Sequence, residues 1–139
     1  MTETQTGPMD AKRLQNILLI SPFHRWLGLR IVSHGRDSLE LEMPWRDEIV
    51  SNPAISAAHG GILSALVDLT GLYAILAAGG VATATADLRV DFHRAATEGP
   101  LRAIGRPIKL GRTLCIADTQ ILSVGGRLLA SGRGAYVSG

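Results

Sequence analysis

An α+β fold, in which an antiparallel β-sheet covers one long apolar helix, is the fold class that the sequence predicts. The span from Gly60 to about Ala78 is apolar nearly all round, as expected of a helix that is buried on most sides. Four later segments alternate apolar and polar residues between turns, which is typical of strands. With 139 residues, of which 46% are hydrophobic, the chain can form a single domain, 1–139, with a sizeable core.

The N-terminal part of the chain is predicted to contain one helix and one β-hairpin. Residues 10–20 carry leucine and isoleucine at helical spacing, and Ser21-Pro22 is expected to end this helix. Residues 1–20 are therefore expected to form an N-terminal helical extension. Residues 27–45 then alternate apolar and polar side chains around a glycine-containing turn, which predicts a hairpin.

The part of the chain on either side of the apolar helix completes the prediction. A loop containing Asn52-Pro53 leads into the helix, and Gly79-Gly80 close it. The four predicted strand segments that follow are 83–95, 101–112, 113–124 and 127–137. Short turns with glycine or proline separate these segments, so consecutive strands are expected to pair in antiparallel fashion.

Charge and cysteine content limit the classes of function. The 14 basic and 12 acidic residues give a formal net charge of +2, which is too small to predict a nucleic-acid partner. The one cysteine, Cys115, lies in an apolar run and is interpreted as a core residue. It cannot form an internal disulfide, and residues 1–13 lack the apolar region of a secretory signal, so a cytoplasmic location is expected.

The apolar helix is long enough to be mistaken for a membrane span. Asp68 would then lie near its centre, at a cost of about 2.5–3.5 kcal/mol on insertion scales. A buried helix in a protein without a membrane partner is therefore the prediction. Because an ionised group among apolar residues is costly unless it is paired or neutral, Asp68 requires an explanation.

The predicted helix has one bulky face and one slender face. At 100° per residue, the residues on the bulky side are Ile62, Leu66, Leu69 and Tyr73, and those on the opposite side are Gly61, Ser64, Ala65 and Asp68. The first backbone N–H groups of the helix have no partner within it, and glycine lets a carbonyl group approach them, as in an oxyanion hole. An ordinary glycine-rich helix start is the alternative, but Asp68 on the same face favours catalysis.

The spacing of Gly61 and Asp68 constrains the mechanism. Seven residues separate them, which is about 10 Å along a helix. Since reacting atoms must approach within about 3–3.5 Å, one copy of the helix does not supply both groups to one carbonyl. Two antiparallel copies related by a two-fold axis do so, which predicts a homodimer with two composite sites.

The stretch HGGILSALVD, with His59, Gly60, Gly61 and Asp68, resembles the HGG-x6-D signature of hotdog-fold acyl-CoA thioesterases of the phenylacetate-degradation (PaaI-like) type. The segments SPFHRWLGLRI, TATADLRVDFHRAA, GRPIKLGRTL and GGRLLASGRGAYV resemble further parts of that family in the same order, from about residue 21 to 137. The resemblance implies a sheet wrapped around a central helix, a homodimer or homotetramer, and hydrolysis of acyl-CoA without metal or organic cofactor.

The resemblance also implies a role for each motif residue. Asp68 matches the catalytic carboxylate, which acts as nucleophile or as general base on water. Gly61 and Gly60 match the N–H donors that polarise the thioester carbonyl. Thr85 matches a Ser or Thr that assists the attacking water or the carboxylate, and His59 matches the motif histidine, which is interpreted as orienting the loop and the acyl group.

Two further sets of residues are less directly implied. Many relatives carry Asn or Gln six residues before the motif histidine, where this chain has Pro53 with Asn52 one step earlier. Either Asn52 takes that role or the hydrogen bond is absent. Candidates to bind the phosphates of coenzyme A are Arg89, Lys109, Gly111 and Arg112. For each cation alone, a solvated sheet face is the alternative.

Two other functions are weighed against hydrolysis. A hotdog hydratase or dehydratase needs a histidine paired with a second carboxylate, but His59 is followed by glycines. A non-catalytic acyl-CoA-binding protein would keep the fold, yet Asp68 and both glycines are present. The remaining histidines lack metal-ligand spacing, so no metal site is predicted.

Overall fold

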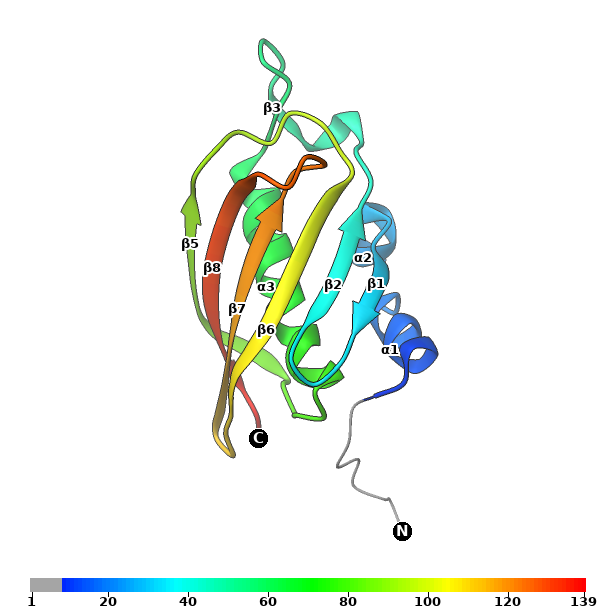
Figure 1. Cartoon of the computed structure of the whole chain (residues 1–139), viewed down its shortest axis with the longest axis vertical. Coiled ribbons are helices and arrows are strands. Elements are labelled where there is room, and N and C mark those ends of the chain that lie inside the picture. Colours follow the sequence, from blue (N-terminus) through cyan, green and yellow to red (C-terminus); the bar gives the residue numbers. More distant parts are fainter. Residues whose placement is uncertain (1–8) are drawn as a thin grey trace.

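A computed structural model describes residues 9–139 of the chain (Figure 1). Its helices are α1 (Ala11–Leu18), α2 (Pro22–Leu27), the 3-10 turn η1 (Asp47–Ile49) and α3 (Gly60–Ala77). Its strands are β1 (Arg30–His34), β2 (Leu39–Met43), β3 (Val50–Asn52), β4 (Ala57–Ala58), β5 (Ala84–Phe92), β6 (Leu101–Leu110), β7 (Leu114–Leu122) and β8 (Leu128–Val137). Of the predicted N-terminal extension 1–20, residues 1–8 lie outside the described part.

One antiparallel sheet and one long helix make up the body of the molecule. Within the described residues the sheet has the order β1-β2-β6-β7-β8-β5, and each neighbouring pair is antiparallel. The helix α3 packs against one face of this sheet, and α1 and α2 lie beside it at the β1 end (Figure 1). The α+β architecture and the four strands predicted after the helix are confirmed.

The helix α3 is the core helix of the protein. Leu66 and Leu69, on the predicted bulky face, are buried, and Ile62 and Tyr73 pack partly buried against the same core. By length and mean hydropathy α3 would also suffice to cross a membrane, but half of it is buried inside this protein. The side of α3 that meets the sheet carries Val67, Thr70, Gly71 and Ala74, whereas Tyr73 of the bulky face contacts His24 of α2.

A tyrosine joins the last strand to the middle of α3. The Tyr136 hydroxyl donates to the main-chain carbonyl of Asp68 at 2.9 Å, and its side chain is fully buried. A Cβ at Gly71 or Gly134 would overlap with the phenol, so these glycines form the slot that admits the ring. The buried Tyr136 side chain therefore fixes the main chain of α3 at Asp68 relative to β8.

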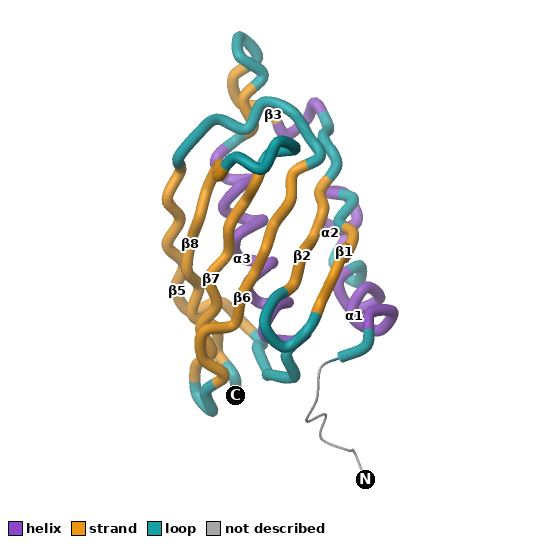
Figure 2. Tube along the Cα trace, viewed as in Figure 1, coloured by secondary structure: helices purple, strands orange, loops and turns teal. Residues whose placement is uncertain are grey.

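Two elements depart from the sequence prediction. The helix α1 ends at Leu18, before Ser21-Pro22 as expected, but the same dipeptide also begins α2. The Ser21 hydroxyl accepts from the His24 N–H, and Pro22 occupies the first turn, where its missing N–H costs nothing. The predicted loop at Asn52-Pro53 is likewise part of a short hairpin, β3–β4, which extends beyond the sheet (Figure 2).

The Gly71 slot makes a prediction about stability. We expect Gly71→Ala to lower the free energy of unfolding by about 1–3 kcal/mol, because the new methyl group overpacks against the Tyr136 phenol. Urea denaturation at fixed protein concentration measures the change. Gly35→Ala is the matched control, since a Cβ there meets no atom within 4 Å. Equal stability of Gly71→Ala and wild type would contradict the packing described.

Candidate functional site

Asp68 is held at the contact between α3 and the edge strand β5. The Thr85 hydroxyl donates to Asp68 Oδ1 at 2.6 Å. The Asp68 side chain is partly exposed, and within residues 9–139 none of the ion pairs involves it. The Asp68 side chain is therefore oriented by a neutral hydroxyl, and none of the described cations pairs with it.

Tyr136 supports the same residue from below. Its hydroxyl bonds to the Asp68 carbonyl, and burial, followed by the negative charge of Asp68, raises the pKa of Tyr136 well above its ordinary value. The phenol therefore stays protonated and remains a donor at any physiological pH. The main chain of Asp68 is fixed by Tyr136 and its side chain by Thr85.

The start of α3 carries a contact that the sequence analysis did not anticipate. His59 is the N-cap, and its Nδ1 accepts a hydrogen bond from the Gly61 N–H at 2.9 Å. An accepting Nδ1 must be unprotonated, so a neutral His59 has its proton on Nε2. Both His59 and Gly61 are exposed. The predicted oxyanion donor of Gly61 is thus at the surface, with the imidazole as its acceptor.

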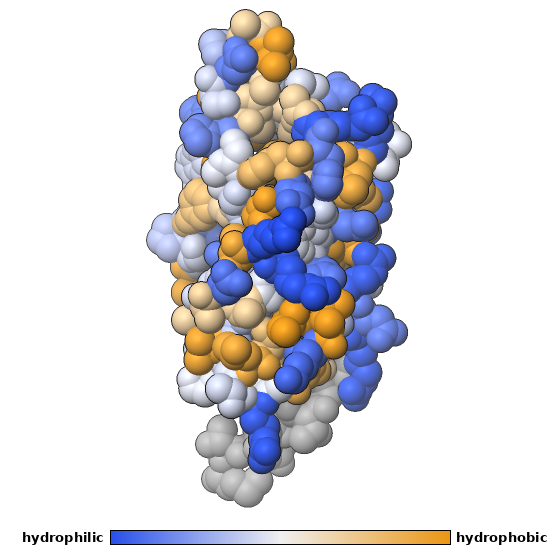
Figure 3. Space-filling view, turned by 90° about the vertical axis from the view of Figure 1, so that its left-hand side faces the viewer, coloured by the Kyte–Doolittle hydropathy of each residue, from blue (hydrophilic) through white to orange (hydrophobic). Residues whose placement is uncertain are grey.

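Gly61 and Asp68 lie on one continuous helix, as the distance argument assumes. Their separation along the axis is about 10 Å at 1.5 Å per residue. The slender face that carries them is not covered by the sheet: Gly61 is exposed, and Ser64, Ala65 and Asp68 are only partly buried. Figure 3 views the molecule from the β5 side, where hydrophobic and hydrophilic surface are interspersed.

A pocket of about 390 Å³ opens beside Asp68. Asp68 and Thr85 line it together with Tyr73 and Leu72 of α3, and His24 of α2 contributes from the N-terminal helices. Neither His24 nor Tyr73 is among the site residues that the sequence predicts. The Ser-Pro signal for a helix start could have placed His24 on a helix, but no local pattern shows which pocket α2 borders.

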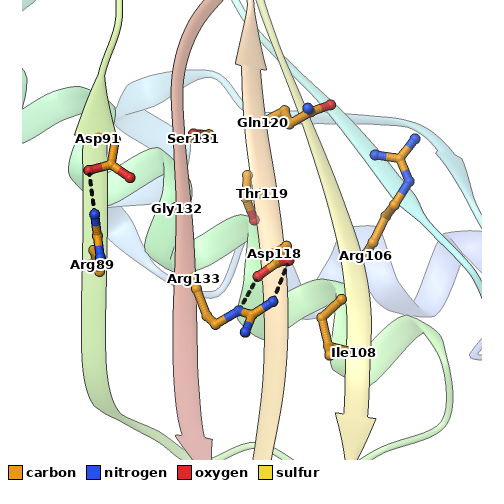
Figure 4. A pocket seen from close by; sticks show the side chains of 10 residues that line it. All are labelled: Arg89, Asp91, Arg106, Ile108, Asp118, Thr119, Gln120, Ser131, Gly132 and Arg133. Atoms are coloured by element: carbon orange, nitrogen blue, oxygen red, sulfur yellow. Dashed lines mark hydrogen bonds and ion pairs between the residues drawn. The ribbon is translucent and has the colours of Figure 1, made fainter.

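A larger pocket, of about 500 Å³, lies on the sheet face opposite α3 (Figure 4). Arg133 forms a two-pronged ion pair with Asp118, at 2.6 and 2.9 Å, and Arg89 pairs with Asp91 at 3.4 Å. Arg106 stands across the pocket from Arg89 (Figure 4). None of the predicted catalytic residues lines this pocket, which is open and bordered mainly by charged and polar side chains.

The predicted coenzyme A contacts fall into two places. Gly111 and Arg112 line a pocket at the β6–β7 turn, and the Lys109 side chain lies beside Gly111. Arg89 instead lines the pocket on the outer sheet face. The structure therefore groups three of the four candidates and separates Arg89 from them.

Asn52 and Cys115 are the remaining residues singled out in the sequence. Asn52 is exposed, and its Oδ1 accepts from the Ala54 N–H at 3.1 Å, so its side chain closes its own turn. Cys115 is buried, which confirms its interpretation as a core residue. Among residues 9–139, no group of three His, Cys, Asp or Glu side chains is arranged to hold a metal ion.

Comparison with known proteins identifies the family. The family model described as the thioesterase superfamily matches residues 56–130, more than half of the chain. The chain belongs to the thioesterase superfamily. The matched segment of this thioesterase-superfamily protein contains His59, Gly60, Gly61, Asp68 and Thr85.

Solved structures agree with this assignment. The chain is 41% identical to a thioesterase-superfamily protein, covering 91% of this chain and 96% of that one, with a TM-score of 0.86. It is 25% identical to zebra fish thioesterase superfamily member 2, covering 94% and 99%, with a TM-score of 0.80. The E. coli PaaI protein of the phenylacetic acid degradation operon shares the fold at 23% identity, covering 91% and 92%, with a TM-score of 0.75.

The hotdog fold and the resemblance to PaaI-like thioesterases are thereby confirmed. Membership of the superfamily indicates a hydrolase that acts on thioesters. The geometry around Asp68 and the start of α3 is then the candidate active site of this thioesterase-superfamily protein.

The His59 contact makes a prediction about the helix start. His59→Ala removes the acceptor of the Gly61 N–H, so we expect the free energy of unfolding to fall by about 0.5–2 kcal/mol. Urea denaturation at fixed protein concentration measures this loss. His59→Asn, whose side-chain oxygen still accepts, is the control and should retain most of the stability. An alanine variant as stable as wild type would show that the imidazole does not cap α3 in solution.

Proposed function

We propose that this protein hydrolyses acyl-CoA thioesters to a free acid and coenzyme A. The observation that carries the proposal is the Asp68 carboxylate, which Thr85 orients at 2.6 Å without neutralising it, beside a pocket on the core helix. Superfamily membership supports thioester chemistry, and coenzyme A is the thiol component that we propose.

Asp68 acts on the water or on the carbonyl itself. As a general base it takes a proton from water, the resulting hydroxide attacks the thioester carbon, and the C–S bond breaks to release the thiolate of coenzyme A, which is then protonated. As a nucleophile its oxygen attacks the same carbon and forms an anhydride, which water hydrolyses in a second step. In both routes Thr85 occupies Oδ1 and leaves the other carboxylate oxygen for the reaction.

The start of α3 supplies the electrophilic half of the site. The N–H groups of Gly61 and Gly60 donate to the oxyanion that forms on the thioester carbonyl. Since Gly61 donates to His59 Nδ1 in the free protein, the substrate carbonyl replaces the imidazole as acceptor when it binds. His59 is then a cap that holds the donor until substrate arrives. Asn52 contributes only if its turn opens, because its oxygen accepts from Ala54.

A second copy of the chain completes the site. Among the described residues β5 pairs only with β8, so its nine-residue outer edge has free backbone groups, which favour strand pairing. This strand runs from Thr85, which contacts Asp68, to Phe92, whose ring lies beside Gly60. Antiparallel pairing of two β5 edges near Leu88 therefore sets Asp68 of one protomer against the partner subunit's Gly60.

The slender face of α3 fits the same dimer. The two helices approach each other closely when β5 edges pair, and small residues permit that approach. Val81 and Phe92, near the two ends of β5, are 55% and 54% exposed in the single chain and become covered. As an extension of this proposal, two such dimers pair to form a homotetramer.

The coenzyme A phosphates are assigned to the β6–β7 turn. Lys109 and Arg112 flank Gly111 there and provide two cations within one exposed turn. Arg89 is a separate candidate, because it lines the outer-face pocket. A cytoplasmic location fits this substrate, and the free, buried thiol of Cys115 is consistent with it.

The alternatives have less support. A hydratase would need a carboxylate at His59, but the described hydrogen bonds join its Nδ1 to the Gly61 N–H. A non-catalytic acyl-CoA-binding protein would not require an Asp68 side chain that is oriented by Thr85 and lacks a cationic partner. Thiol release separates these functions from hydrolysis.

Removal of the Asp68 charge tests the proposal. We expect wild-type protein to release thiol from a panel of acyl-CoAs, and Asp68→Asn to lower kcat by about 10²–10⁴-fold, because the amide accepts no proton and makes a poor nucleophile. A thiol-reactive chromophore follows the release. Asp37→Asn, at an exposed turn position, is the control and keeps wild-type kcat. The absence of thiol release by wild type, or full activity in Asp68→Asn, would contradict the proposal.

Mixed dimers test the composite site. Gly61→Pro lacks the N–H donor but fits the first helical turn, and Asp68→Ala lacks the carboxylate. Each variant alone is expected to be nearly inactive. After equal amounts are unfolded and refolded together, half of the dimers are mixed and each has one intact site, so about a quarter of wild-type activity should return.

The mixing experiment has an internal control. Gly61→Ala keeps the N–H, so by itself it should retain more activity than Gly61→Pro. Asp68 and Thr85 lie in the same half of the site. Mixing Asp68→Ala with an inactive Thr85 variant should therefore recover no activity. If Gly61→Pro with Asp68→Ala also recovers nothing although mixed dimers form, the composite site is wrong.

A further inference from the structure

We infer that His24 is a specificity-determining residue, and that it selects acyl groups with a hydroxyl or N–H donor about six bonds from the carbonyl. The inference rests on the proposed function, because it places the acyl group in the pocket beside Asp68. It concerns a part of the pocket that the N-terminal helices build and that the motif around α3 does not include.

The pocket runs along the second half of α3. Asp68 and Thr85 lie at its reactive end, and Tyr73 follows Asp68 by five residues, about 7.5 Å along the helix axis. Leucines of α3 and Ile17 of α1 supply apolar walls. An acyl group whose carbonyl is at Asp68 therefore extends toward Tyr73 and the residue packed on it, His24.

The His24 ring is held in one orientation. Its Nδ1 lies 2.8 Å from the Leu18 carbonyl, and its ring meets Tyr73 edge-on, with centroids 5.8 Å apart at 79°. The main-chain N–H of His24 also donates to the Ser21 hydroxyl that caps α2. The ring is thus fixed between α1, the α2 cap and α3.

This orientation decides which polar atom faces a ligand. A carbonyl oxygen only accepts, so Nδ1 of His24 must carry the proton toward Leu18. A neutral ring then has its lone pair on Nε2, and no hydrogen bond within residues 9–139 uses that nitrogen. His24 lines the pocket and its Nδ1 is used by the Leu18 carbonyl, so Nε2 is the ring nitrogen that we assign to a bound acyl group.

The other polar groups of the pocket have partners already. The Thr85 hydroxyl donates to Asp68, the Thr83 hydroxyl donates to the Val137 carbonyl at 3.1 Å, and the Tyr73 hydroxyl faces the Ile17 carbonyl at 3.5 Å. Closing the pocket over an apolar chain would leave Nε2 of His24 dehydrated and unpaired, which is costly. A ligand with a donor at that position satisfies it, so such ligands are favoured.

A matched pair of substrates tests this selection. From the carbonyl carbon of 6-hydroxyhexanoyl-CoA, the hydroxyl is six bonds away, about 7.5 Å in an extended chain, and hexanoyl-CoA lacks it. We expect wild type to have a kcat/KM at least about tenfold higher for the hydroxylated substrate, corresponding to one satisfied hydrogen bond. The readout is the ratio of the two kcat/KM values, which is independent of the folded fraction.

The His24→Asn variant separates recognition from structure. Its Nδ2 replaces Nδ1 as donor to the Leu18 carbonyl, but it has no atom in the place of Nε2. We expect the ratio to fall to about one. His24→Gln is the converse variant, because it places an amide near the Nε2 position but has no donor for the Leu18 carbonyl. We expect it to keep part of the preference for the hydroxylated substrate and to have a lower Tm. His34→Asn, remote from the pocket lining, should keep the wild-type ratio.

The outcomes distinguish this inference from the proposed function. If wild type and His24→Asn hydrolyse both substrates with the same ratio, His24 has no role in selection, although the hydrolase stands. If wild type releases thiol from neither substrate, the proposed function fails. In that case, calorimetric Kd values for 6-hydroxyhexanoate and hexanoate test the role of His24. Tighter binding of the hydroxylated acid by wild type that is lost in His24→Asn supports the inference. Equal Kd values for the two acids, or no binding of either acid, overturn it.

Discussion

The hydrogen bond from Thr85 to Asp68 is the interaction on which the site depends. A carboxylate on the core helix loses part of its hydration, and a cation beside it would neutralise the charge that the proposed reaction uses. A neutral hydroxyl at 2.6 Å orients the group without adding a positive charge. The same bond ties α3 to the edge strand β5, so the position of the acid and the position of the free edge are linked.

That link bears on the proposed site, which uses two copies of the chain. The electropositive start of α3 and its carboxylate share one face of one helix, about 10 Å apart, and no bend brings them together. The edge strand runs alongside both, from Thr85 to Phe92. In the proposed dimer, a two-fold axis through the middle of β5 would exchange the two ends and bring an N–H donor to the acid of another copy.

Local patterns were sufficient for the long elements and insufficient for the short ones. The core helix was predicted from its long run of apolar residues, and the last four strands were predicted from alternation that extends over many residues. The helix α2 was missed because Ser21-Pro22 ends one helix and begins the next: proline cannot continue a helix, yet its fixed φ suits a first turn. Strands β3 and β4, of three and two residues, have no detectable alternation.

The sequence by itself determined the fold class, the slender face of the core helix, and the presence of Asp68 and the two glycines on it, because these follow from spacing along one element. Only the tertiary structure decided that Thr85 contacts Asp68, that His59 covers the Gly61 N–H, and that Arg89 is separated from Lys109. Alternation along a strand shows which residues share a face, but not which strand or helix lies beside it. That choice is made by burial and pairing between segments far apart in the chain.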